Sequence, residues 1–327
     1  MTIKEIAQLA GVSTAAVSRY FNGGSLSDDK RKKIAKVVEK YSYVPNSLAQ
    51  TMRTGKSGQI GVIVPHIHSD SVSQIMAGIA IALHENEYSF ILCCTDEARE
   101  KEVEFIEAMQ RGGMDGILLM GTVMTPYLRN AIEKCKIPIV VTGQSFSGVS
   151  CVYHDDVHSM KDITRLMLKK RDRVVYIGVN EEDEAAGRAR KKGVEKAFEE
   201  AGLGSESLIS EVSDFTIEGG CLAAKKLLEK CPDLNGIVCA TDRIAHGAIL
   251  ALKESGRKVP KDVSVTGVGN CWADIVSEPQ LTTVKLYFEQ CGTTAVNLLM
   301  RMIRADGEKE PISDIKLGYQ IIERGSI

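Results

Sequence analysis

Residues 2–22 read TIKEIAQLAGVSTAAVSRYFN, and this stretch decides the fold of the N-terminal region. Thr2 and Glu5 have the spacing of a capping box, in which each side chain accepts a hydrogen bond from a backbone N–H of the other residue. Apolar residues then recur at helical spacing until Gly11 interrupts them, and Ser13 offers a second N-cap. The stretch therefore predicts two short helices joined by a turn that contains glycine.

Two helices joined in this way are typical of a helix-turn-helix, whose second helix enters the major groove of DNA. An ordinary helical hairpin has the same pattern, and the charge distribution separates the two interpretations. Residues 1–56 hold ten Lys and Arg against four Asp and Glu, so their net charge is +6 and the rest of the chain carries −8 of the total of −2. A basic segment beside an acidic remainder favours nucleic-acid binding.

Composition places the chain among ordinary globular proteins. It has 327 residues, of which 44% are hydrophobic and 26% charged, and this length exceeds one small core. No apolar run approaches the ~20 residues of a membrane span, and the N-terminus opens on a capped helix rather than on a signal sequence. We therefore expect a cytoplasmic, nucleoid-associated protein. The nine cysteines include no C-x-x-C pair, which predicts reduced cysteines that fill the core.

We predict that Ser27 caps a third helix, since Asp28 and Asp29 after it suit the positive end of a helix dipole. Its buried stripe should contain Ile34, Val37, Val38 and Tyr41. Basic side chains lie elsewhere on the same helix, where they are either simply solvated or in contact with phosphate.

Residues 46–53 follow Pro45 and could form about two helical turns, capped by Asn46 or Ser47. Helices shorter than ~12 residues are marginal in water, so this one would form only with a partner or DNA. We interpret it as a conditional hinge helix rather than a plain linker. The predicted domains are therefore a helix-turn-helix domain at 1–45, a hinge helix and linker at 46–57, and a ligand-sensing and dimerisation domain at 58–327.

From residue 58 onward, strand runs alternate with helical stretches in two groups, which predicts two lobes built on parallel sheets with right-handed crossovers. The predicted strands are 60–64, 90–94, 117–120 and 139–141 in the first group and 174–177, 237–239 and 263–268 in the second. A strand at 281–285 and a helix at 292–304 should cross back to the first lobe. The fold class is thus α/β, with an all-α module in front.

Polar residues follow the predicted strands, at 65–66, 142–144, 180–181, 241–242 and 267–270. Parallel sheets bind ligands at the carboxyl ends of their strands. Hydroxyl, amide, carboxylate and guanidinium groups suit a polyol, and aromatic rings cover the apolar faces of sugars. These positions predict a site for a small sugar-like ligand.

Patterns for enzymes and metals are weak in this chain. Gly267 and Gly269 follow a strand, but Trp272 stands where a dinucleotide fingerprint needs glycine, and there is no Walker motif. Two groups of residues could be drawn as metal ligands without forming a closed tetrahedral set, namely His66 with His68, and His154 with Asp155, Asp156 and His158. We expect no catalytic residues, no cofactor and no functional metal.

The stretches IKEIAQLAGVSTAAVSRYFNGG and YVPNSLAQTMRTGKSGQIGVIVP resemble the lactose-repressor family of bacterial transcription regulators, and later motifs follow that family's order along the whole chain. The resemblance implies a two-lobed domain like that of periplasmic sugar-binding proteins. It also implies a hinge helix that pairs across a homodimer and wedges an apolar side chain into the minor groove. Met52, at this position, replaces the usual leucine.

The motif and the resemblance together give candidate site residues. Those predicted to contact DNA are Thr2, Ser13, Thr14, Ala15, Ser18, Arg19, Asn22, Asn46, Ala49 and Met52.

For the effector, Arg190 matches the family arginine that forks onto sugar hydroxyls, and Phe215 matches an aromatic wall position. Asp242 is retained, whereas Thr241 replaces the usual asparagine. Asn270 falls where many members have a pair of aspartates. Gln144, Trp272 and Phe288 are added from position alone, and helix capping or packing is the alternative role for every one of these residues.

We therefore predict a homodimeric repressor of near-palindromic operator DNA whose affinity is controlled by a small sugar-like effector. A regulator that senses a phosphorylated sugar or another polar metabolite, as a corepressor, is the alternative. A carbohydrate-binding protein without a DNA role is disfavoured, because it has no use for the basic segment.

Overall fold

The computed structural model describes residues 1–21, 23–43, 56–305 and 310–327. The chain divides into two compact units, residues 1–58 and residues 59–327. None of the described helices is long and apolar enough to cross a membrane.

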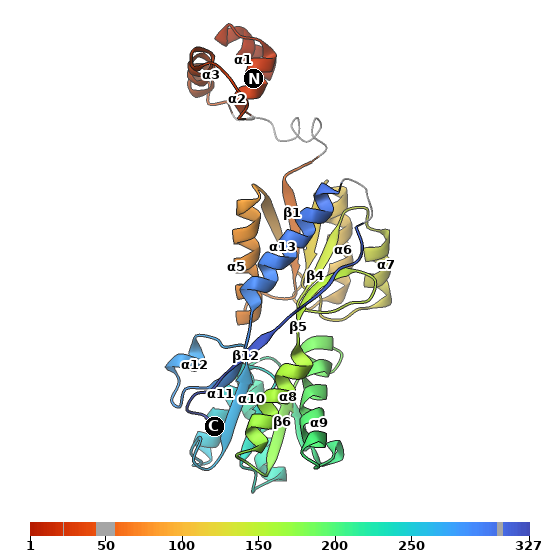
Figure 1. Cartoon of the computed structure of the whole chain (residues 1–327), viewed down its shortest axis with the longest axis vertical. Coiled ribbons are helices and arrows are strands. Elements are labelled where there is room, and N and C mark those ends of the chain that lie inside the picture. The colour runs from red at the N-terminus through yellow and green to blue at the C-terminus, as the bar shows by residue number, and fades with distance from the viewer. Residues whose placement is uncertain (22, 44–55, 306–309) are drawn as a thin grey trace. The chain divides into compact units, whose positions relative to one another are not determined.

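The described residues of the first unit form three helices, α1 (Ile3–Ala10), α2 (Thr14–Phe21) and α3 (Asp28–Lys40) (Figure 1). The predicted capping box is present, since Glu5 Oε2 accepts from the Thr2 backbone N at 2.7 Å and Thr2 Oγ1 accepts from the Glu5 N at 3.3 Å. Gly11 ends α1 with φ of 63°, a left-handed conformation that glycine adopts without strain. The turn between the two helices is therefore set by local sequence.

The core of this unit is small, with Ile6, Val17 and Ile34 completely buried. Two details of the α3 prediction were wrong. Ser27 occupies the N-cap position, but its side chain makes no capping hydrogen bond. Tyr41 lies outside the buried stripe with 45% of its surface exposed, because the helix ends at Lys40 before Tyr41 can face the core.

The larger unit contains two six-stranded sheets that define two lobes. The strands of the first lobe, in the order β11-β5-β4-β3-β1-β2, are all parallel, whereas β12 in the second lobe, ordered β12-β10-β9-β8-β6-β7, runs antiparallel to β10. The first-lobe strands are β1 (Gln59–Val64), β2 (Ser89–Cys94), β3 (Gly116–Leu119), β4 (Ile139–Thr142), β5 (Ser150–His154) and β11 (Asp314–Leu317). The second-lobe strands are β6 (Val174–Gly178), β7 (Ser210–Val212), β8 (Gly236–Cys239), β9 (Ser264–Val268), β10 (Thr282–Leu286) and β12 (Tyr319–Ile322).

The helices associated with the first-lobe sheet are α5 (Asp70–Glu85), α6 (Arg99–Arg111), α7 (Pro126–Lys134) and α13 (Phe288–Arg304). Those of the second lobe are α8 (Asp156–Leu168), the π-helix η1 (Glu184–Ala189), α9 (Arg190–Glu200), the short 3-10 helix η2 (Ser205–Ser207), α10 (Ile217–Lys230), α11 (Asp242–Glu254) and α12 (Ala273–Val276). The two-lobed architecture of parallel sheets confirms the predicted fold class.

The chain passes between the lobes three times, after β5, after β10 and after β11 (Figure 1). The predicted return to the first lobe is correct for the helix and wrong for the strand, because β10 pairs with β9 in the second lobe and α13 packs against α5 in the first. Gly78 and Gly292 allow this close packing, since a Cβ at either position would lie about 2 Å from a backbone oxygen of the other helix.

The segment β5–α8 was missed by the sequence analysis, as were the short strands β7, β11 and β12. The apolar run at 151–153 leads directly into the polar residues 154–156 and 158, which the sequence analysis interpreted as possible metal ligands. This omission matters, because β5 and α8 supply two residues of the ligand cavity.

Candidate functional site

The second helix of the first unit presents an exposed polar face. Thr14, Ala15 and Arg19 are exposed and Ser18 is half-buried, while Ala16 and Val17 on the opposite face are buried in the core. The exposed residues are spaced by one helical turn, so one groove of DNA could contact them together. Ser13 caps this helix, its Oγ accepting from the Ala16 N at 3.2 Å, and Thr2 caps α1.

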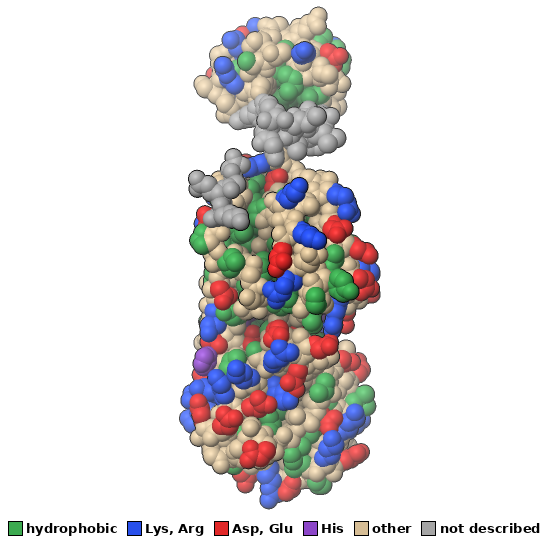
Figure 2. All heavy atoms as spheres, turned by 90° about the vertical axis from the view of Figure 1, so that its right-hand side faces the viewer, with side chains coloured by type: hydrophobic (Ala, Val, Ile, Leu, Met, Phe, Trp, Pro, Cys, Tyr) green, Lys and Arg blue, Asp and Glu red, His purple; other side chains and the backbone are tan. Residues whose placement is uncertain are grey.

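Basic side chains accompany this helix. The face that Figure 2 shows carries both basic and acidic side chains on the first unit, as it does on the larger unit. Lys30, Arg31, Lys32, Lys33 and Lys36 of α3 are all exposed. The predicted DNA-contacting residues Asn22, Asn46, Ala49 and Met52 lie outside the described residues.

A cavity of about 690 Å³ lies in the larger unit, where the carboxyl ends of strands from both lobes meet. Its volume is within the roughly 300–1,000 Å³ of small-molecule sites. Residues that follow β1, β4, β8 and β9 line it, including His66, Gln144, Thr241 and Gly269. Parallel strands of the two sheets thus bring these polar loops together.

Arg190 and Asp156 form a buried ion pair in the wall of this cavity. Arg190 Nε donates to Asp156 Oδ1 at 2.8 Å and Nη1 donates to the Ala240 carbonyl oxygen at 2.6 Å. Both residues are less than 10% exposed, and both line the cavity. Within the described part of the chain these bonds leave Nη2 for a ligand.

Four buried polar atoms of the cavity lining have no hydrogen-bond partner among the described residues. They are His66 Nδ1, Thr142 Oγ1, Gln144 Oε1 and His154 Nε2. Burial lowers the pKa of His154, which favours the neutral imidazole. Buried polar groups normally have partners, so these atoms indicate where hydroxyl groups of a ligand would bind.

Asp242 begins α11 and lines the cavity. Its Oδ1 accepts from Thr283 Oγ1 at 2.5 Å and its Oδ2 accepts from the Cys271 backbone N at 3.3 Å. Burial, and then the nearby charge of Asp274, raise the pKa of Asp242 well above its usual value. Thr241 is the N-cap of the same helix, so the capping alternative applies to its hydroxyl, which accepts from the Ile244 N.

Aromatic side chains complete the cavity. Phe215 and Phe288 both line it, with Phe215 39% exposed and Phe288 buried. The Phe288 ring makes an edge contact with the His154 ring at a centroid distance of 5.1 Å. His154 lies at the first passage of the chain between the lobes and Phe288 at the second. The contact between their rings therefore joins these two connections.

Two of the predicted effector residues do not line the cavity. Trp272 is 73% exposed, and the Asn270 side chain turns to Arg324, whose Nη2 donates to its Oδ1 at 2.6 Å. The loop after β9 explains the difference, because its alternate residues Gly269 and Cys271 face the cavity instead. Neither Asn270 nor Trp272 is therefore among the residues that line the cavity.

Asp156 and His154 are cavity residues that the sequence analysis considered solely as possible metal ligands. A stronger signal was present in the sequence. The apolar run at 151–153 precedes Asp155, which caps α8 by accepting from the His158 N, and Met160, Ile163 and Met167 follow at helical spacing.

Several polar contacts join the two lobes around the cavity, including the Arg243–Asp70 ion pair. Gln144 Nε2 donates to Asp183 Oδ1 at 3.0 Å, and Arg99 pairs with Glu182 at 2.5 Å. Arg243 Nη2 donates to the His68 carbonyl oxygen at 2.6 Å. These polar contacts across the cavity therefore help to set its width.

A DNA-binding helix-turn-helix attached to two parallel-sheet lobes with a polar cavity defines a class of ligand-responsive transcription regulators. Residues 2–46 match the family described as bacterial regulatory proteins, lacI family, and residues 163–327 match the periplasmic binding protein-like domain. The chain belongs to the lacI family of bacterial regulatory proteins.

Two relatives match this chain over nearly their whole length. The HTH-type transcriptional regulator RegA of Clostridium saccharobutylicum is 29% identical, with 99% of this chain and 98% of the relative covered. The sucrose operon repressor of Staphylococcus xylosus is 28% identical, with 97% and 99% covered.

Solved structures of transcription regulators are also similar to this chain. The complex of the transcriptional regulator CelR with cellobiose is 25% identical with a TM-score of 0.76, covering 100% of this chain and 99% of that one. The lac repressor bound to ONPG in its repressed state is 21% identical with a TM-score of 0.90 and the same coverage, which supports the fold.

Proposed function

We propose that this protein is a transcriptional repressor that binds a near-palindromic operator as a homodimer and loses operator affinity when a small neutral sugar enters the cavity. The proposal rests on the presence, in one chain, of an exposed recognition helix and of a cavity lined by polar atoms without partners among the described residues. A DNA-binding domain as small as this first unit gains affinity and specificity when two copies bind two half-sites. Such a regulator would act in the cytoplasm, at the nucleoid.

The charge of the cavity supports a neutral effector over a phosphorylated one. Eight carboxylates line it, against three arginines. Each arginine already has an acidic partner, in the pairs Arg99–Glu182, Arg190–Asp156 and Arg243–Asp70. A phosphate group would need cations that are free of such partners, so we expect sugar hydroxyls to be the groups recognised.

The proposed signal runs through the contacts that join the lobes. A ligand that bridges Gln144 in the first lobe and Arg190 in the second would hold the lobes in one relative position, which is the differential interaction that allostery requires. We propose that the ligand closes the two lobes, and that this closure separates the attachment points of the hinge segment at 46–53. Operator affinity then falls by a coupling free energy of about 1–3 kcal/mol.

A thermal-shift screen of monosaccharides, disaccharides and their phosphates tests the effector. A compound specific to the folded state raises the melting temperature by mass action, and we expect neutral sugars among the hits. Each hit is then added to a gel shift with operator DNA obtained by binding-site selection. Release of DNA supports the inducer role, tighter binding would make the sugar a corepressor, and hits confined to phosphorylated sugars would contradict the charge argument.

A further inference from the structure

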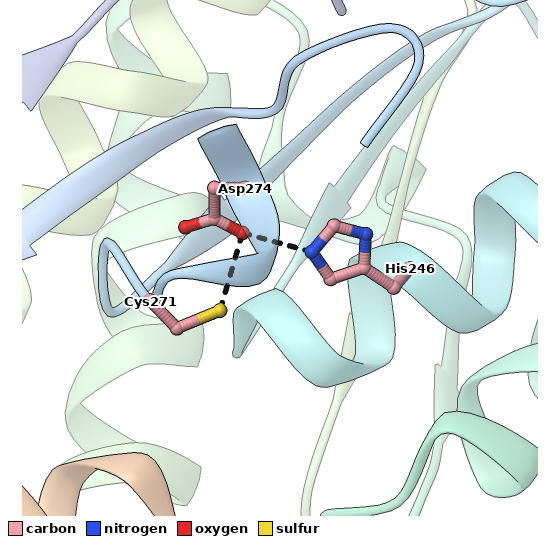
Figure 3. A group of neighbouring side chains, drawn as sticks. All are labelled: His246, Cys271 and Asp274. Atoms are coloured by element: carbon pink, nitrogen blue, oxygen red, sulfur yellow. Dashed lines mark hydrogen bonds and ion pairs between the residues drawn. The ribbon is translucent and has the colours of Figure 1, made fainter. Parts of the chain in front are cut away.

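Three potential metal-ligating side chains meet next to the cavity. His246 comes from α11, Cys271 from the loop after β9, and Asp274 from α12 (Figure 3). Asp274 Oδ1 lies 2.9 Å from His246 Nε2 and 3.4 Å from Cys271 Sγ. One potential ligand atom from each of the three residues lies within 4.8 Å of the others. Figure 3 shows the imidazole and the thiol both directed at the same carboxylate.

This carboxylate is poorly compensated by the protein. Asp274 is completely buried, and its second oxygen, Oδ2, has no hydrogen-bond partner among the described residues. The buried carboxyl of Asp242 lies beside it. Within the described part of the chain neither carboxyl pairs with a lysine or an arginine, and His246 is the sole basic partner of Asp274. Two adjacent buried carboxyls are costly unless a cation or a shared proton neutralises them.

We propose that His246, Cys271 and Asp274 bind one divalent transition-metal ion of the Zn²⁺ class. A thiolate, an imidazole and a carboxylate together favour Zn²⁺ over Mg²⁺ or Ca²⁺, which prefer oxygen ligands. Tetrahedral coordination at ordinary Zn²⁺ bond lengths places nitrogen, oxygen and sulfur ligands roughly 3.3–3.6 Å apart. The Cys271–Asp274 distance already fits, and the His246–Asp274 distance has to open by a few tenths of an ångström.

Charge and space are compatible with the ion. A dication bound by one thiolate and one carboxylate is neutral overall, and the proton of the thiol leaves to solvent when the ion binds. The fourth ligand is a water molecule, and the Asp242 carboxyl lies beside it, where it accepts from the Cys271 backbone N. The ion would fix the loop after β9 against α11, at the wall of the cavity that Cys271 and Asp242 line. The site is independent of which effector the cavity takes.

The test uses the full chain without a histidine tag, stripped with a chelator and shown to stay folded by circular dichroism. Titration with Co²⁺ should give one equivalent bound, with thiolate charge-transfer absorption and the visible bands of a tetrahedral site. Zn²⁺ should displace Co²⁺ and raise the melting temperature. Cys271→Ser should abolish the charge-transfer band and weaken Co²⁺ binding by more than the roughly 10–100-fold that loss of an outer-shell partner causes.

Cys231→Ser is the matched control, because Cys231 Sγ also contacts a carboxylate, Asp233 Oδ1 at 3.3 Å, in a different part of the second lobe. This variant should keep the Co²⁺ spectrum of the wild type. The proposal is overturned if Co²⁺ binds only at millimolar concentration, if it binds without a thiolate band, or if the band survives Cys271→Ser. In each of these cases His246, Cys271 and Asp274 would be a hydrogen-bonded group that shares a proton. The wild-type titration decides even when the variant fails to fold.

Discussion

Arg190 donates from Nε to Oδ1 of Asp156 at 2.8 Å, and this buried ion pair joins the start of α9 to the start of α8 in the wall of the ligand cavity. The pair fixes the plane of the guanidinium before any ligand binds. A preorganised fork loses little side-chain entropy on binding, which makes Arg190 suited to recognise two hydroxyl groups at once.

Arg190→Ala should therefore destabilise the larger unit as well as remove ligand recognition. Loss of one partner leaves Asp156 buried without compensation, which costs about 3–5 kcal/mol. Urea unfolding measures this cost. Lys191→Ala is the matched control, because its pair with Glu181 is partly exposed and should contribute no more than about 1 kcal/mol. Similar losses in both variants would show that the Arg190–Asp156 pair is not the cause.

Arg19→Ala should change which DNA sequence is preferred. Arg19 is exposed one turn after Thr14 and Ala15, and an arginine that forks onto guanine contributes about 1–3 kcal/mol of discrimination. Binding-site selection should then show a relaxed preference at one base pair in each half-site. Arg31→Ala on α3 serves as the comparison and should weaken binding to all sequences alike. An unchanged motif for Arg19→Ala would reduce that residue to a phosphate contact.

The capping box at Thr2 should contribute more to the stability of the first unit than Ser27 at the start of α3. Thr2→Ala removes a hydrogen bond to the Glu5 N and should lower the unfolding free energy of the first unit by about 0.5–2 kcal/mol. Ser27→Ala should change it by much less, because the Ser27 side chain makes no capping bond. Thermal unfolding of both variants checks the difference, and a larger effect of Ser27→Ala would contradict it.

Stability should depend on pH through Glu102, a buried residue of α6. Burial raises the pKa of Glu102 to about 7, against the lowering effect of Arg99. Because the folded-state pKa lies above that of the unfolded chain, the stability from the protonated group is complete below about pH 4.5 and is lost as pH rises through 7.

Glu102→Gln should accordingly stabilise the protein at pH 8 by about 2–3 kcal/mol, with a gain that shrinks as the pH falls towards 4.5. Urea unfolding across this range measures the trend. Glu104→Gln, exposed on the same helix, should change the unfolding free energy by less than about 0.5 kcal/mol at every pH. A gain from Glu102→Gln that does not vary with pH would exclude titration as its source.

Most of the architecture followed from local sequence. The capping box at Thr2, the turn at Gly11 and the alternation of strand and helix depend on hydrogen bonds and apolar periodicity within a few residues, so they can be read along the chain. The rule that ligands bind beyond the carboxyl ends of parallel strands also located the cavity, and Gln144, Arg190 and Asp242 lie in its wall.

Tertiary structure alone decided which side chains of a loop face the cavity and which distant residues meet. Trp272 and Cys271 are neighbours in sequence, yet the loop after β9 exposes the first and buries the second. His246 and Asp274 are separated by 28 positions and come within 2.9 Å because α11 packs beside that loop. The physical reason is that loop conformation and helix packing depend on contacts among segments far apart in the chain, which no local pattern encodes.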